Sequence, residues 1–158
     1  MSERAAALAA EFERVNNELI ATVEGLSDAQ WRTTCAAEGW PVGVTAHHVA
    51  VSHGPVAGLA MLIANGQPLP GITPAQIDAG NAQHAREHAN CTRAETVALL
   101  RNEGARAAGL VRGLSDEQLD RTAPFFGGAP WSAADVVQRI LIGHPQSHLA
   151  SIQQATAG

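Results

Sequence analysis

Two histidines near the end of the chain, His144 and His148, stand four residues apart in the segment GHPQSHLASI. Residues at this spacing lie on the same face of an α-helix, one turn apart. They share the phase of the apolar residues Val137, Leu141 and Ile152, which predicts that both imidazoles face the protein interior. Burial of an imidazole without a partner is costly, whereas two neutral ring nitrogens on one helical face can ligate zinc or nickel.

A third histidine, His48, follows the apolar phase of Val44 and Leu59 in an expected helix earlier in the chain. His47 is rotated from that phase by about 100°, and His53 is also out of phase. Three interior imidazoles from two helices would form a metal site with open coordination positions. The alternative is that each is an ordinary core histidine bonded to a carbonyl or a water. The HxxxH pair alone is a weak motif, and the addition of His48 favours the metal.

Pro145 lies between the two late histidines. It removes a backbone donor to Leu141 and disfavours helical geometry at His144. The sequence is compatible with two structural consequences of this proline. Either the helix is distorted beside the site and re-aims a ligand, or His144 is displaced and the site is degenerate.

Other residues offer weaker candidates for chemistry. HAREH (84–88) fits the HxxEH pattern of inverted zinc proteases, with Glu87 as the base. Those enzymes are much larger and need a downstream acidic ligand that is not recognisable here, so we do not favour a protease. Asn81 and His84 either border the metal pocket and contact substrate or belong to a solvated helical face. Trp40 is a further pocket candidate, with packing at the end of the bundle as the alternative.

Hydrophobic periodicity and capping residues predict the elements that position these groups. The predicted helices cover residues 3–24, 41–65, 74–113 and 132–154. Gly54-Pro55 is expected to kink or split the second helix, and a capping box at Thr92 and Glu95 is expected to interrupt the third near Cys91. No segment alternates with period two for long enough to form a sheet. The fold class is therefore all-α, a four-helix bundle with one or two long connections.

Composition narrows the class of protein. The 158 residues most simply form a single domain, 1–158, and a net charge of -5 without a basic stripe argues against a nucleic-acid partner. No apolar run is long enough for a membrane span, and the N-terminus does not resemble a signal peptide. Cys35 and Cys91 form no paired motif, so we expect reduced thiols, with Cys35 more readily a structural thiol than a site residue. The expected location is the cytoplasm.

Three motifs together resemble the DinB-like (YfiT-like) superfamily. They are GWPVGVTAHHVA, with Trp40 eight residues before His48, then IDAGNAQHA, then HPQSHL, in the family's order and spacing. The resemblance implies a four-helix bundle with a divalent metal, commonly zinc or nickel, held by His48, His144 and His148. It also implies a homodimer. Relatives include thiol-dependent S-transferases that use bacillithiol or mycothiol, and mycothiol-dependent maleylpyruvate isomerases, some of which have Glu at the position of His144.

Several functions follow from this interpretation. A metal-dependent enzyme acting on a small-molecule substrate is the first, with metal-bound water or thiol as the nucleophile. The resemblance favours thiol S-transfer or an isomerase-like reaction with a low-molecular-weight thiol as cofactor, and a metal-dependent hydrolase would use the same site. A non-catalytic protein that binds a small molecule or metal in a stress response, or a scaffold, is the alternative from another class.

Overall fold

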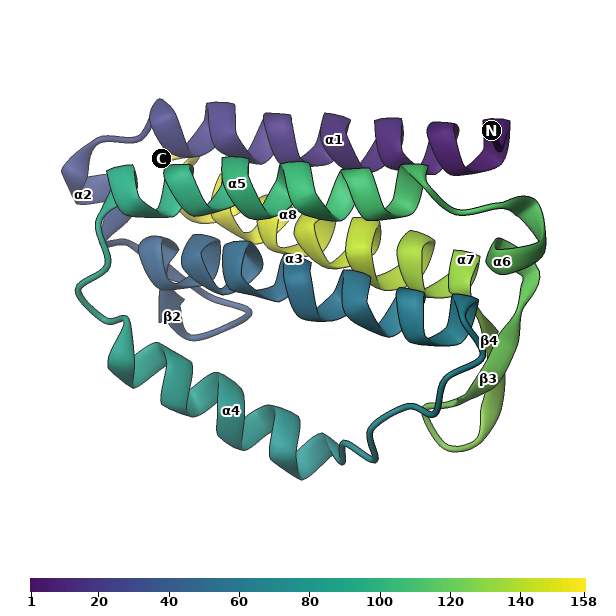
Figure 1. The fold of residues 1–158 in the computed structure, drawn as a ribbon. Helices are drawn as coiled ribbons and strands as arrows, with labels where there is room; N and C mark the ends of the chain where they lie inside the picture. The colour runs from purple at the N-terminus through teal and green to yellow at the C-terminus, as the bar shows by residue number, and fades with distance from the viewer.

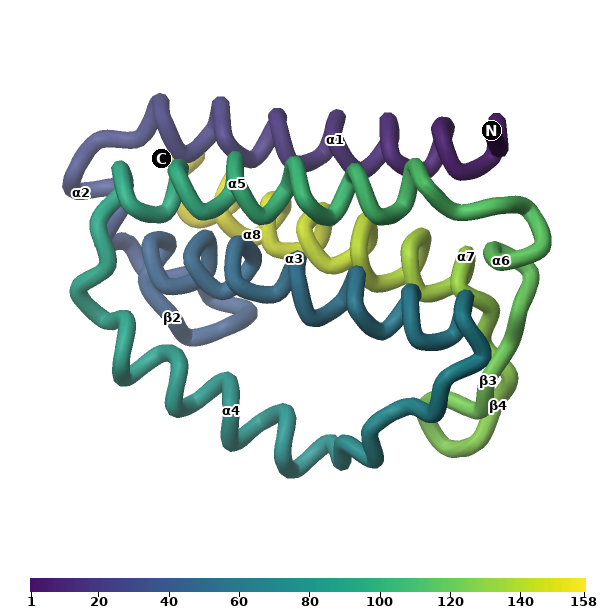
Figure 2. Tube along the Cα trace, in the orientation of Figure 1, coloured from purple at the N-terminus to yellow at the C-terminus, as the bar shows by residue number.

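Four long helical segments lie side by side along the length of the molecule (Figure 1). The structure is a computed structural model that describes all residues 1–158. The segments are α1 (Glu3–Glu24), α3 (Val42–Ala64), α5 (Arg93–Arg112) and a final helix formed by α7 (Ala133–Val136), the π-helical stretch η1 (Val137–Ile142) and α8 (Gly143–Thr156). Both α5 and the final helix pack on α1 and on α3 (Figure 2). The predicted all-α four-helix bundle is confirmed, and none of its helices combines the length and apolar character of a membrane span.

Smaller elements fill the connections between the long helices. They are α2 (Asp28–Trp31), α4 (Pro74–Glu87), α6 (Asp116–Asp120) and two antiparallel hairpins, β1 (Thr34–Cys35) with β2 (Trp40–Pro41) and β3 (Thr122–Phe125) with β4 (Ala129–Ser132). The expectation of no sheet is therefore wrong for these two hairpins. Their strands of two and four residues are too short to display the period-two pattern by which a strand is recognised.

Helix boundaries follow the capping residues. The predicted third helix is two helices, because Thr92 accepts a hydrogen bond from the backbone of Glu95 and starts α5, as expected. Pro55, in contrast, does not split α3, which runs uninterrupted from Val42 to Ala64. The carbonyl deprived of a donor by Pro55 is that of Val51, a residue 37% exposed.

Helix α3 is buried on most of its circumference. The bundle covers one side, while α4 and the first hairpin pack on others. His47 and His53 are therefore 2% and 1% exposed, although the apolar phase predicted that they lie off the core face. A helix that is buried nearly all round has no single apolar stripe, so periodicity cannot assign its inner face.

The final helix passes Pro145 without a break. The six residues Val137–Ile142 form a π-helix, and α-helical geometry resumes at Gly143 and includes both His144 and His148. A π-helix changes the backbone hydrogen-bond pattern of the turns that precede the proline, including Leu141. The local distortion lies ahead of the histidines, and His144 stays on the bundle side of the helix, near His48.

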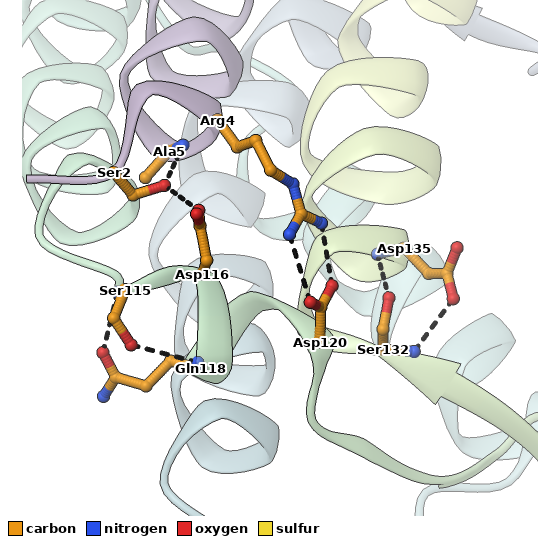
Figure 3. A network of polar contacts seen from close by, with 9 residues as sticks. All are labelled: Ser2, Arg4, Ala5, Ser115, Asp116, Gln118, Asp120, Ser132 and Asp135. Carbon is orange, nitrogen blue, oxygen red and sulfur yellow. Dashed lines mark hydrogen bonds and ion pairs between the residues drawn. The ribbon is translucent and has the colours of Figure 1, made fainter.

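Polar contacts fix the start of α1 against α6 (Figure 3). Ser2 accepts a hydrogen bond from the backbone of Ala5 and donates one to Asp116, while Arg4 donates two, at 2.8 and 3.2 Å, to Asp120. Figure 3 also shows the capping boxes of Ser115 with Gln118 and Ser132 with Asp135. The side chains of Arg4 and Asp120 are 50% and 65% exposed, so this ion pair orients the helix end more than it stabilises the fold.

A buried amide links three of the long helices and gives a first prediction. Asn16 donates to the carbonyl of Leu100 and accepts from His53, both at 2.9 Å, and a Cβ added at Gly104 would overlap its amide nitrogen. We expect Gly104→Ala to lower the free energy of unfolding by about 1–3 kcal/mol. The matched control is Gly109→Ala on the same helix, where an added Cβ meets nothing within 4 Å. That variant should gain about 0.5–1 kcal/mol from helix propensity. Urea unfolding measures both, and shifts of the same sign would contradict the packing argument.

Candidate metal centre

Three imidazole nitrogens meet between α3 and α8. The Nε2 atom of His144 lies 2.9 Å from Nε2 of His48 and 3.0 Å from Nε2 of His148. One ligand atom from each ring lies within 4.8 Å of the others, and His48 is buried while the other two are half-buried. The structure thus brings together the three histidines that the sequence singles out. That they bind a metal remains a prediction.

Only one of the two short nitrogen–nitrogen contacts in this cluster can be a hydrogen bond. A ring nitrogen carries either one hydrogen or one lone pair, so Nε2 of His144 can form one good hydrogen bond, with His48 or with His148. A cation at the cluster would instead accept a lone pair from every ring. The donor set fits a divalent metal of the zinc or nickel class, for which neutral imidazole is a favoured ligand.

Burial keeps two of these imidazoles, those of His48 and His144, in the neutral form that ligates metals. It lowers the pKa of His48 to about 3, assisted by the neighbouring His144, His148, His84 and His47. Burial also lowers the pKa of His144 to about 4, with His148 as the second cause. Both rings are therefore uncharged at pH 7 without a metal, and binding requires no proton to be displaced from them.

Glu38 orients the third ring and was not singled out from the sequence. Its Oε1 lies 2.8 Å from Nδ1 of His148, and its other carboxylate oxygen is buried without a hydrogen-bond partner. An ionised carboxylate only accepts hydrogen bonds, so Nδ1 of His148 carries the hydrogen and Nε2 presents its lone pair to the cluster. Carboxylate–histidine pairs of this kind commonly support metal ligands. The only sequence signal was an acidic residue in the loop before Trp40.

The three pocket candidates occupy different places. Trp40 packs against His48, with ring centroids 5.2 Å apart, and so borders the cluster. His84 lies on α4 with its ring 5.7 Å from that of His48, but its Nε2 atom contacts Nδ1 of His47 at 2.8 Å. Asn81, one turn earlier on α4, is half-buried and makes no hydrogen bond to the histidines of the cluster.

Cys35 is a structural thiol. It is fully buried in the core that contains Leu19, Val42 and Ile152, and burial raises its pKa. A buried thiol with a raised pKa is a poor nucleophile. Cys91 also has a pKa raised by burial, and its Sγ donates to the carbonyl of Gly43.

Comparisons with known proteins agree with this architecture. The family model of the DinB superfamily matches residues 11–152. The solved structure of YfiT from Bacillus subtilis superposes with a TM-score of 0.80 and 23% sequence identity, over 99% of this chain and 89% of that one. That protein is described as a probable metal-dependent hydrolase with an unusual four-helix bundle topology. No curated protein matches. The family match covers most of the sequence, and it confirms the resemblance carried by the three motifs: the chain belongs to the DinB superfamily.

Proposed function

We propose that this protein is a divalent-metal-dependent hydrolase whose ligands are His48, His144 and His148. The supporting observation is the convergence of three Nε2 atoms, of which His144 faces two neighbours at 2.9 and 3.0 Å and can hydrogen-bond to only one. The description of YfiT as a probable metal-dependent hydrolase agrees with the proposal. A divalent metal held there would lower the pKa of a water that it binds and so supply a nucleophile near neutral pH.

The residues around the cluster have distinct parts in this proposal. Glu38 holds the tautomer and orientation of His148. Trp40 covers one side of His48 and limits the access of water and substrate from that direction. Three protein ligands leave coordination positions for water and a small-molecule substrate. The low pKa values of His48 and His144 keep these two ligands neutral across the physiological pH range.

Thiol transfer is the second candidate, and a neighbouring cavity favours it. A cavity of about 580 Å³ begins at the first turn of α3, at Gly43 and Val44, and is also lined by Arg32 and Arg93. Arginine recognises carboxylates through paired hydrogen bonds. An anionic low-molecular-weight thiol of the bacillithiol type would complement the charge of these two arginines; Asp28 also lines the cavity, and no histidine does.

One experiment tests both reactions. The untagged protein is stripped with a chelator, reloaded with zinc or nickel, and assayed against a panel of esters and amides and for conjugation of thiols to electrophiles. We expect turnover only in the loaded protein, and in His144→Ala we expect loss of turnover and of the metal bound at His48, His144 and His148. His144→Glu, which keeps a ligand atom, should retain part of both. Metal-dependent thiol conjugation without hydrolysis would replace the first candidate by the second. Bound metal with ligand-induced thermal stabilisation but no product would overturn both in favour of a binding protein.

A further inference from the structure

We propose that His47, His84 and His88 form a second divalent-metal site, which attaches α4 to the bundle. It is separate from the His48–His144–His148 cluster and would hold a metal that imidazole favours, such as zinc, nickel or cobalt. It does not depend on the proposed hydrolysis, because a structural metal needs no substrate.

The geometry of these three rings carries the proposal. One ligand atom from each of His47, His84 and His88 lies within 4.8 Å of the others. Nδ1 of His47 is 2.8 Å from Nε2 of His84, and the ring of His88 stacks on that of His47 with centroids 4.2 Å apart. His84 and His88 are one helical turn apart at the end of α4, and His47 approaches from α3. As in the first cluster, two of the three histidines come from one helix and the third comes from another.

An unsatisfied atom lies within the second cluster. The Nδ1 atom of His84 is buried and has no hydrogen-bond partner. A buried polar nitrogen without a partner is destabilising, and a bound water or ion is one way in which folded proteins satisfy such an atom. The contact between His47 and His84 can supply one hydrogen bond, but it leaves this second nitrogen of His84 unpaired.

Helix α4 needs an attachment that its apolar side chains do not give. It contains no buried residue and packs mainly on α3. Figure 1 shows it outside the four long helices, reached by loops at both ends. A metal that joins His84 and His88 to His47 would fix the end of α4 beside the first cluster, since the rings of His48 and His84 are 5.7 Å apart.

Metal stoichiometry tests the site. The untagged chain is stripped, equilibrated with zinc, freed of unbound ion by gel filtration and measured by elemental analysis. We expect two zinc ions per chain in the natural sequence, one in His88→Ala, one in His144→Ala and none in the double variant. Gln83→Ala, at an exposed position of the same helix, is the matched control and should keep two.

Hydrogen exchange gives a readout that does not depend on counting ions. Zinc should slow backbone exchange across α4 in the natural sequence and in His144→Ala, but not in His88→Ala. The second site would be overturned if the natural sequence binds one zinc per chain, His88→Ala retains it, and hydrogen exchange in α4 is insensitive to zinc. If the natural sequence instead binds one zinc per chain, and that zinc is lost in His88→Ala but retained in His144→Ala, the result would support the second site and overturn the metal centre of the proposed hydrolase.

Discussion

Replacement of Glu38 by alanine is expected to weaken zinc binding at His48, His144 and His148 by about 10- to 100-fold. The carboxylate of Glu38 holds the hydrogen on Nδ1 of His148 at a distance of 2.8 Å. Without that acceptor the ring can rotate or move its hydrogen to Nε2, the atom that faces His144. Each of these changes removes one ligand for part of the time. Competition with a chromophoric chelator at pH 7.5 measures the loss of affinity.

Two further variants separate orientation from charge. Glu38→Gln keeps an acceptor oxygen but no charge, so its affinity should fall between those of alanine and the natural residue. Glu117→Ala removes an exposed carboxylate on α6, whose side chain is 82% exposed, and should leave zinc binding unchanged. Zinc binding in Glu38→Ala as tight as in the natural sequence would show that Glu38 does not support the metal ligand. To keep the second cluster from contributing, all these variants are compared in a His88→Ala background.

The sequence was sufficient for the parts of the site that lie on regular helices. An HxxxH pair in phase with Leu141 predicted that His144 and His148 share a face, and helical geometry alone produces this. Capping residues such as Thr92 marked the boundaries of helices, because their side chains satisfy backbone donors locally. The four-helix fold followed from these local signals.

The roles of residues that act through tertiary contacts could not be predicted from local sequence patterns in this way. Glu38 reaches His148 only because the loop of the first hairpin folds onto α8, across 110 positions of sequence. His47 was placed off the core face because its phase differs from that of Val44, yet α4 covers it. The sequence of its neighbours His84 and His88 fits a protease-like motif that we did not favour, and it predicts that His84 either borders the metal pocket or lies on a solvated helical face. Their convergence on His47 requires the position of α4 relative to α3, which no local pattern contains.

Acid is expected to destabilise the metal-free protein through His53, which lies outside both clusters. This ring is 1% exposed, and burial lowers its pKa to about 4. In the unfolded chain the ordinary value is 6.5. Between these two values the unfolded state binds more protons, so stability decreases as pH falls from 6.5 toward 4 and is fully present above 6.5. At about 1.4 kcal/mol for each pKa unit, the contribution of this one histidine is about 3 kcal/mol.

The variant His53→Gln isolates this contribution, because glutamine does not titrate and can still donate to Asn16. We expect the variant to be less stable at pH 7.5, since it loses the packing of His53 on Phe12, whose ring centroid is 4.9 Å away. The difference between the two proteins should shrink by up to about 3 kcal/mol as pH falls to 4. Urea unfolding of both metal-free proteins at several pH values measures it. His48, His84 and His144 also have lowered pKa values, but their contributions occur in both proteins and cancel in the difference. Parallel stability curves would mean that His53 is solvated in the folded state, and the buried link from α3 through Asn16 to α5 would then be absent.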